Sequence, residues 1–313
     1  MKNLFPACLA AWIGFATLNP AAAATQPGGD FTVVALPDTQ FYCRDFPNIF
    51  LAQTDWIIAQ RTNLNIVYVA GLGDIVQDGD KFPEQWHVAT NALYRLESPA
   101  LTGLPDGIPY GVVPGNHDHI GGIRNYNKFF SAEHFAVHKY YGGHYGKNNQ
   151  SHYDLISAGG LEFIWLYIDF SSYGTNVDYS GVDAWADGVL KSNANRRAVV
   201  ISHDILPVAG GFDPRGREIY EKLKGNTNFF LLLCGHHHGE ARRADVFAGR
   251  TVHTCLSDYQ GYTNGGNGFL RTYQFSPSNN VIRVKTYSPW TKEFKTNTSS
   301  QFEIPYAMGG KER

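Results

Sequence analysis

The sequence predicts an α/β fold in which helices cover a largely buried sheet. Apolar, β-branched runs such as Phe31–Leu36, Asn65–Ala70 and Ala198–Ser202 alternate with amphipathic helical stretches. Runs that are apolar throughout are typical of strands buried on both faces. Residues of metal-ligating type follow several of these runs directly, and sheets of this class bind ligands at the carboxyl ends of their strands.

The alternation of strands and helices continues to about residue 250, and the pattern then becomes all-β. Further strands are predicted at Tyr110–Val113, Leu161–Phe170 and Asn228–Cys234, helices at Asn48–Arg61, Glu84–Leu96, Val182–Lys191 and near Pro214–Lys224, and late strands at Thr251–Cys255, Phe269–Phe275 and Val281–Tyr287. Gly142–Gln150 and Gly261–Gly268 are predicted as loops without an element of their own, serving either as lids or as surface insertions. We expect one domain over residues 25–313.

The first 24 residues have the pattern of a secretory signal peptide. Lys2 precedes an apolar stretch from Leu4 to Leu18, and an alanine run ends at Ala24, where cleavage is expected. The competing interpretation is a membrane anchor, but the apolar stretch is short for a span. We therefore expect an exported protein, periplasmic or secreted, without another membrane segment.

The charge balance argues against one class of partner. The formal net charge is −2 and no basic stripe stands out, so binding of long nucleic acid through phosphate neutralisation is not expected. Three cysteines follow the expected cleavage point. Cys234 and Cys255 each end a predicted strand, and either a disulfide between them or buried free thiols fits the spacing.

Five short segments hold the residues with the clearest chemistry. They contribute Asp38 and Gln40, then Asp74, then Asn116 and His117, then His203, and finally His236 and His238. Taken alone, the segments of Asp38, Asp74 and His203 are more often structural, because Asp and Thr cap turns and a lone histidine is commonly a core residue. Gly115–Asp118 is more specific, and three consecutive histidines after a strand are unusual. In this order, each after a strand, they predict a site for two divalent cations, with Asp74 bridging them.

The same segments resemble the calcineurin-like metallophosphoesterases, and Pro37–Gln40 and Asp258–Gln260 resemble the exported bacterial members of that family. The resemblance implies a two-sheet β-sandwich flanked by helices on both sides, a four-layer αββα arrangement. It also implies two divalent metal ions and hydrolysis of phosphoesters. By analogy, Asp38, Asp74 and His238 hold metal one, whereas Asp74, Asn116, His203 and His236 hold metal two. His117 lies beside the metals and protonates the leaving group or stabilises the transition state.

Two positions depart from the family pattern. Gln40 stands where the family has histidine, so metal one is expected to favour Mn²⁺, Mg²⁺ or Ca²⁺ over Zn²⁺, although Zn and Fe stay among the candidates. Alternatively, Gln40 only orients a water. Asp78 lies one position beyond the usual acidic partner of the catalytic histidine, and either orients His117 or belongs to a solvated loop.

The expected reaction is attack on phosphorus by a water whose pKa the two metals lower. The substrate is a small phosphoester, and monoesters and diesters both fit. His119, Arg124, His144 and Tyr259 are candidate substrate contacts. The competing hypothesis is an exported binding or structural protein that has a weakened metal-one site. The sequence leaves the oligomeric state undecided.

Overall fold

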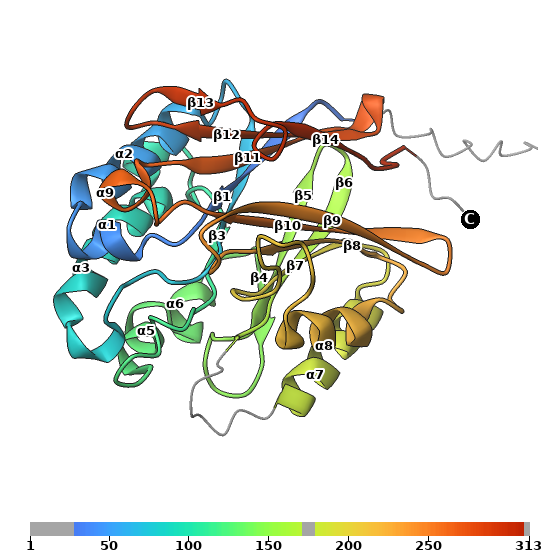
Figure 1. Cartoon of the computed structure of the whole chain (residues 1–313), viewed down its shortest axis with the longest axis horizontal. Helices are drawn as coiled ribbons and strands as arrows, with labels where there is room; N and C mark the ends of the chain where they lie inside the picture. The colour runs from blue at the N-terminus through green and yellow to red at the C-terminus, as the bar shows by residue number, and fades with distance from the viewer. Residues whose placement is uncertain (1–27, 171–178, 310–313) are drawn as a thin grey trace, which may run out of the picture.

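Two mixed sheets face each other and carry helices on their outer sides. The computed structural model describes residues 28–170 and 179–309. Within those ranges the first sheet has seven strands in the order β13-β12-β11-β1-β2-β3, with β14 paired to β12, and the second has seven in the order β4-β5-β6-β7-β8-β10-β9 (Figure 1). The predicted α/β fold with two sheets and flanking helices is therefore confirmed.

The strands have the following bounds. The first sheet contains β1 (Phe31–Leu36), β2 (Ile66–Gly71), β3 (Tyr110–Gly111), β11 (Leu270–Ser276), β12 (Val281–Ser288), β13 (Glu293–Lys295) and β14 (Phe302–Pro305). The second contains β4 (Tyr141–His144), β5 (His152–Ala158), β6 (Leu161–Tyr167), β7 (Arg197–Ile201), β8 (Phe229–Cys234), β9 (Gly239–Phe247) and β10 (Arg250–Asp258).

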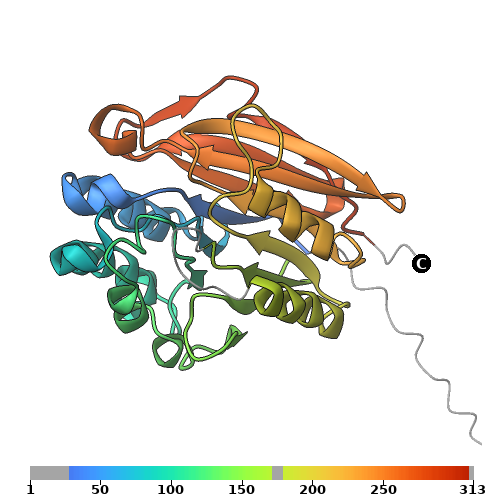
Figure 2. The same cartoon turned by 60° about the horizontal axis from the view of Figure 1, so that its bottom comes forward.

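Two pairs of longer helices form the outer layers. They are α2 (Pro47–Gln60) and α3 (Pro83–Leu93) beside the first sheet, and α7 (Tyr179–Ser192) and α8 (Pro214–Leu223) on the second (Figure 2). The shorter helices are α1 (Gln40–Arg44), α4 (Pro99–Thr102), α5 (Arg124–Phe129), α6 (Ala132–Phe135), α9 (Thr263–Gly266), η1 (Gly79–Lys81), η2 (Tyr94–Glu97) and η3 (Pro277–Asn279).

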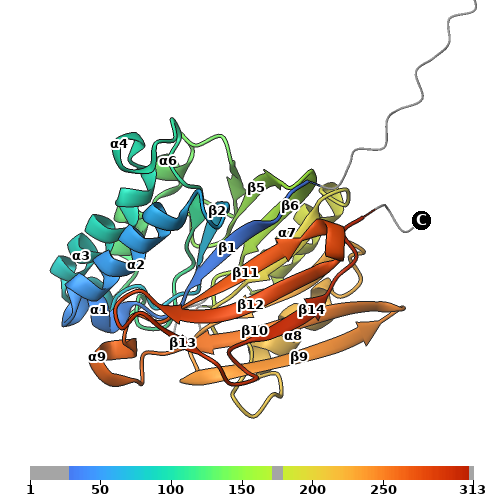
Figure 3. The ribbon, with the colours of Figure 1, turned by 90° about the horizontal axis from the view of Figure 1, so that it is seen from above.

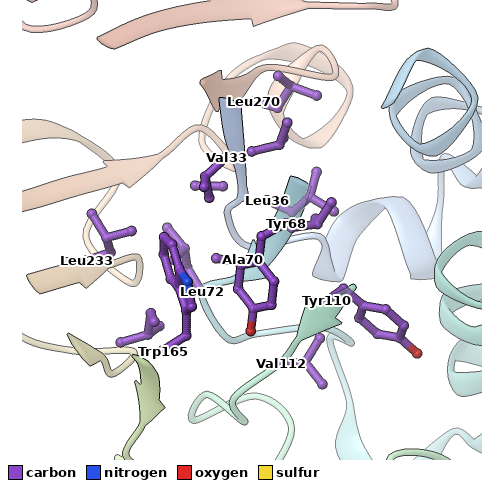
Figure 4. Close-up of a cluster of buried hydrophobic side chains, with 14 of the residues drawn as sticks. Val33, Leu36, Tyr68, Ala70, Leu72, Tyr110, Val112, Trp165, Leu233 and Leu270 are labelled. Carbon is purple, nitrogen blue, oxygen red and sulfur yellow. The ribbon is translucent and has the colours of Figure 1, made fainter. Parts of the chain in front are cut away.

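The two faces of the second sheet bury two different sets of residues. In β6, Ile164 and Leu166 belong to the cluster that contains residues of α7 and α8. Phe163, Trp165 and Tyr167 belong instead to the cluster shared with the first sheet. Successive side chains of a strand point to opposite faces, so the uninterrupted apolar run of β6 separates two hydrophobic layers. Figure 4 shows the inter-sheet cluster, in which Trp165 lies near side chains of the first sheet.

The strands that lead to the predicted ligands run parallel. β1 pairs with β2 and β2 with β3 in the first sheet, and β6, β7, β8 and β10 pair in succession in the second, all in parallel. Their carboxyl ends therefore lie at one edge of each sheet, which brings together loops far apart in the sequence.

Some elements differ from the sequence expectations. β4 occupies the start of the loop predicted at Gly142–Gln150, and α9 is a single turn with Asn264 and Gly265 in left-handed conformation. Strand β9 was not predicted, because its residues are mostly polar and half-buried or exposed. Such composition is usual for an edge strand, where one side of the backbone lacks a partner.

Two further expectations are affected by what the structure describes. Within residues 28–170 and 179–309, no helix has the length and apolar character needed to span a membrane. The predicted signal peptide lies outside the described residues. Cys234 and Cys255 sit on neighbouring strands as buried free thiols, and the Cys234 Sγ lies 3.8 Å from the carbonyl oxygen of Cys255. Of the two arrangements considered, the structure has free thiols.

Candidate metal centre

The strand ends bring six of the seven predicted metal ligands into one region or its immediate surroundings. Asp38 follows β1, Asp74 follows β2, and Asn116 follows β3. His203 follows β7 and His236 follows β8, so both sheets contribute. Gln40 is the first residue of α1, two positions after Asp38 in the sequence, and its side chain is buried. His238, the seventh predicted ligand, lies against Gly261.

Asp74 and His203 form the buried centre of the site, and both are fully buried. The His203 Nε2 lies 3.2 Å from the Asp74 Oδ2 and 3.2 Å from the Asn116 Oδ1. His236 completes the group, because ligand atoms of Asp74, His203 and His236 all lie within 4.8 Å of one another. Carboxylate, imidazole and amide oxygen in this arrangement match the donor set of a catalytic divalent cation.

The backbone hydrogen bond of His203 decides which ring nitrogen is available. The His203 Nδ1 lies 2.9 Å from the carbonyl oxygen of Leu72, an acceptor, so Nδ1 carries the proton and Nε2 faces Asp74 and Asn116. Histidines that bind metals usually donate their second N–H in this way. Burial lowers the pKa of His203, but the charges of Asp74 and Asp38 outweigh burial and raise this pKa to about 10. The site therefore favours positive charge between these residues.

Asp38 connects the first strand to the histidine loop. Its carboxylate accepts a hydrogen bond from the backbone N–H of His236 at 3.1 Å, and its Oδ1 lies 3.8 Å from the His203 Nδ1. Burial, and after it the charge of Asp258, raise the pKa of Asp38 well above its usual range. For Asp74, burial acts in the same direction, but His203 outweighs it and lowers the pKa. A cation at this edge would relieve the repulsion among these carboxylates.

Three predicted ligands have positive φ, namely Asp38 at 25°, Asp74 at 48° and His236 at 73°. A non-glycine residue in this region costs on the order of 1–3 kcal/mol. Such strain is concentrated at functional sites, where it holds side chains in place for a ligand.

Three motif glycines explain why the site needs glycine beside its ligands. A Cβ on Gly73 would lie 2.5 Å from the His203 Nδ1, and one on Gly115 would lie 2.2 Å from the Asp74 Oδ1. A Cβ on Gly235 would lie 2.3 Å from the Asp38 Oδ2. All three distances are below van der Waals contact, so these glycines make room for the carboxylates and the imidazole.

One buried oxygen tests whether the residues fit a metal. The Gln40 Nε2 donates to the Gln77 Oε1 at 3.0 Å, whereas the Gln40 Oε1 is buried without a hydrogen-bond partner. A buried polar atom without a partner is costly unless something binds it. The Gln40 Oε1 is a hard oxygen donor, as are the nearby carboxylates of Asp38 and Asp74, so the residues present fit divalent cations.

His117 is held at the site by its backbone and by one ring nitrogen. Its N–H donates to the Asp74 Oδ1 at 2.8 Å, and its Nδ1 lies 2.8 Å from the Gln77 carbonyl oxygen. The Nδ1 is therefore the protonated nitrogen, and Nε2 is left for a substrate. The Asp78 carboxylate instead accepts a hydrogen bond from the Gln85 Nε2 at 2.7 Å. The orienting role considered for Asp78 is thus filled by the Gln77 carbonyl, because Asp78 is turned toward α3.

The three consecutive histidines have different surroundings. His236 belongs to the centre, and the His237 Nε2 lies 3.0 Å from the Asp204 Oδ1. His238 is exposed, and its Nδ1 lies against Gly261, where a Cβ would sit 2.9 Å away. Asp204 and His237 form a further cluster with His236, so His236 adjoins two groups of potential ligands.

Three of the predicted substrate contacts differ in their local partners. The His119 Nε2 lies 3.1 Å from the Asp169 Oδ1, just beyond the end of β6, and Arg124 is 86% exposed beside Asp80. His144 lies on the edge strand β4 with its Nδ1 3.1 Å from the Tyr141 hydroxyl.

Tyr259 is wrongly predicted as a substrate contact. Its side chain is buried, and its hydroxyl donates to the Glu240 Oε1 at 2.8 Å. The sequence placed it in a loop after a strand, but the loop turns this ring into the space between the sheets.

Asp118 is a structural determinant of the site that the sequence reading did not single out. Its carboxylate accepts hydrogen bonds from the N–H groups of Ile75, Val76 and Gly115 at 3.0, 2.9 and 2.8 Å. It therefore ties the loop of Asp74 to the loop of Asn116 and His117. Its place in the Gly115–Asp118 motif was the available signal.

The chain belongs to the calcineurin-like phosphoesterase family, whose pattern it matches over residues 31–240. It is 38% identical over 274 residues to the uncharacterized protein YvnB of Bacillus subtilis strain 168, a match that covers 84% of this chain. The chain spans 20% of the length of that relative.

Solved structures with the same fold include two with low sequence identity. GAP50, described as the anchor in the inner membrane complex of Plasmodium, has a TM-score of 0.55 and 15% identity, over 91% of this chain and 90% of GAP50. A dimetal phosphatase from Danio rerio has a TM-score of 0.53 and 14% identity, over 90% of this chain and 100% of the phosphatase. At this identity the two structures support the fold alone.

Proposed function

We propose that this protein is an exported, metal-dependent phosphoesterase that hydrolyses phosphomonoesters or phosphodiesters at a two-metal centre. One observation carries the proposal. The buried His203 Nε2 lies 3.2 Å from the Asp74 Oδ2 and 3.2 Å from the Asn116 Oδ1. A family of phosphoesterases provides the reaction class. The dimetal character named for the Danio rerio relative is consistent with it.

The site residues divide into two sets of ligands, one for each metal, and the set for metal two is the stronger. Asp74, Asn116, His203 and His236 would hold metal two, and Asp74 would bridge to metal one. Asp38 and the unpartnered oxygen of Gln40 would hold metal one. His238, whose ring lies against Gly261, would be the imidazole ligand of metal one. Because an amide oxygen stands at Gln40, metal one would be the weaker site, and its oxygen donors favour Mn²⁺, Mg²⁺ or Ca²⁺.

Two bound cations would supply the charge that lowers the pKa of the attacking water and neutralises the phosphoryl oxygens. The protein's own contribution is to position and to exchange a proton. The Gln77 carbonyl binds the His117 Nδ1, which leaves Nε2 as the ring nitrogen for the substrate. With a proton at this atom, His117 hydrogen bonds a phosphoryl oxygen or protonates the leaving group. His119, held by Asp169, provides a second imidazole at the rim.

Export rests on the signal-peptide pattern of residues 1–24, which lie outside the described structure. The Pro37–Gln40 and Asp258–Gln260 motifs support placement in the exported bacterial group of the family. Expression with a processing assay would test this, because mature protein should begin after Ala24. An unprocessed protein retained in the cytoplasm would contradict the export proposal.

The activity test begins with chelator-treated protein and bis-p-nitrophenyl phosphate or p-nitrophenyl phosphate. We expect no turnover until Mn²⁺ is added, and restored turnover after it. Asp74→Asn should stay inactive and bind less metal, since the bridge is lost. Folded wild-type protein that binds two metals but hydrolyses neither ester would favour a binding protein on this scaffold. Wild-type turnover by folded Asp74→Asn would refute the proposed centre.

A further inference from the structure

A second cluster of metal-ligating side chains lies away from the candidate metal centre. Glu97 on η2, His134 on α6 and His138 just after α6 each offer one ligand atom, and these atoms lie within 4.8 Å of one another. We propose that Glu97, His134 and His138 bind one zinc ion at a site separate from the phosphoesterase centre.

The polar contacts of the cluster leave one donor unused. The His134 Nε2 lies 2.7 Å from the Glu97 Oε1, and the buried hydroxyl of Tyr110 donates to the same Glu97 oxygen. The His138 Nε2 is buried and has no hydrogen-bond partner. Two imidazoles and one carboxylate are an established zinc donor set, which leaves a fourth position for water. A zinc ion would give the His138 nitrogen the partner that it lacks.

The scaffold already holds both imidazoles in defined orientations. The His134 and His138 rings lie near each other, with centroids 6.2 Å apart, although His138 follows the end of α6. The His134 N–H is bonded to the Ser131 hydroxyl at 3.1 Å, which caps α6. The Tyr94 ring stacks on His134 with centroids 4.7 Å apart, and the Tyr140 ring stacks on His138 at 5.1 Å. These contacts reduce the ordering required when an ion binds.

The adjustment that zinc requires is small. Tetrahedral zinc with bonds of about 2.0–2.1 Å separates its ligand atoms by about 3.3 Å. The pair Glu97 and His134 is closer than this, at 2.7 Å, and the widest separation in the cluster is at most 4.8 Å. Side-chain rotations that change these separations by a few tenths of an ångström to about 1.5 Å would therefore bring all three atoms to zinc distance.

The cluster is distinct from the phosphoesterase centre. Tyr110, which contacts Glu97, is the first residue of β3, whereas Asn116 follows the end of that strand. Figure 3 shows α4 and α6 together at one edge of the molecule, apart from α1, which follows the carboxyl end of β1. Among the described residues, the hydrogen bonds and ion pairs of Glu97, His134 and His138 do not reach Asp38, Asp74 or His203. A zinc ion here would join η2 to α6.

The test counts zinc in a background in which the phosphoesterase centre is weakened. Chelator-treated His203→Ala protein is dialysed against Zn²⁺ alone, and metal per chain is measured by mass spectrometry. We expect His203→Ala/His138→Ala to bind one zinc fewer than His203→Ala. A matched control is His203→Ala/His87→Ala, which removes an exposed histidine outside both clusters and should leave the count unchanged. Equal counts in all three proteins would overturn the proposal.

A second measurement covers the case in which His138→Ala folds poorly. Glu97→Gln keeps the size of the side chain but removes its charge. Zinc should raise the Tm of His203→Ala by several degrees and that of His203→Ala/Glu97→Gln by much less, since a ligand that binds only the folded state stabilises it. An equal rise in both proteins would overturn the site. His138→Ala alone should keep wild-type turnover with Mn²⁺, and a loss of turnover in folded protein would contradict the separation of the two sites.

Discussion

The strongest single prediction concerns the buried ion pair that joins the two sheets. Arg271 in β11 is fully buried, and its Nη2 lies 2.6 Å from the Glu240 Oε1 in β9. Glu240 is two residues beyond His238, so the pair also anchors the end of the histidine loop. Arg271→Met keeps much of the side-chain volume but leaves the Glu240 carboxylate buried without its cation.

The magnitude follows from what each partner keeps. Removing one member of a buried ion pair typically costs about 3–5 kcal/mol. Glu240 retains hydrogen bonds from the hydroxyls of Tyr259, Thr286 and Ser300 at 2.8, 3.1 and 2.5 Å, which favours the lower end for the charge, about 3 kcal/mol. The carbonyls of Leu256 and Ser299, which accept from Arg271 at 3.0 and 3.1 Å, lose their bonds as well, adding about 1 kcal/mol in all. We expect a total loss of about 4 kcal/mol.

The assay is urea denaturation of metal-free protein at pH 7. With an m value of about 3 kcal/mol/M, the midpoint should fall by about 1.3 M. The pH matters because burial opposes ionisation but Arg271 outweighs it and lowers the pKa of Glu240. The pair therefore stabilises the fold above the unfolded pKa of Glu240, and this contribution is lost as pH falls through the folded value. The double variant Arg271→Met/Glu240→Gln should recover part of the loss. A loss below about 1 kcal/mol for Arg271→Met would refute the reasoning.

Three further predictions concern the candidate site and its surroundings. His117→Ala should lower kcat by about 10²–10⁴, the range for a general acid, with bound metal unchanged by mass spectrometry; a loss of metal would make His117 a ligand. Gly235→Ala should reduce both bound metal and turnover, because its Cβ would lie 2.3 Å from the Asp38 Oδ2. The control is Gly188→Ala in α7, whose Cβ would meet nothing within 4 Å. Equal metal content in both variants would contradict the steric argument. Burial lowers the pKa of His152 to about 3, so the unfolded chain takes up its proton first and stability should fall as pH drops from about 6.5 toward 3. His152→Phe should flatten that pH dependence, and an unchanged slope in urea midpoints would count against it.

Much of the candidate site was predictable because its residues follow strands in a fixed order. Asp38, Asp74, Asn116, His203 and His236 each come directly after an apolar run. Parallel strands place such positions at one edge whatever the intervening loops do. The fold class and the approximate position of these residues therefore followed from local sequence.

The contacts that orient the site could not be predicted in the same way. His117 is oriented by the backbone carbonyl of Gln77. Any residue type at position 77 would offer the same oxygen, provided that its φ and ψ were the same. Asp78, one residue on, had the suggestive chemistry but faces Gln85. Backbone acceptors carry no sequence signature, so loop conformation alone decides between such neighbours.

The sequence by itself determined the order of strands and helices, the family, and the set of residues that end at the carboxyl edge of the sheets. Only the tertiary structure decided which of those residues meet. It turned Tyr259 inward to Glu240, set His238 against Gly261, and brought Glu97 beside His134 across 37 positions of sequence. Periodicity and strand ends are local properties of the chain, whereas the partner of a buried polar group depends on which distant loops the packed sheets bring within hydrogen-bond distance.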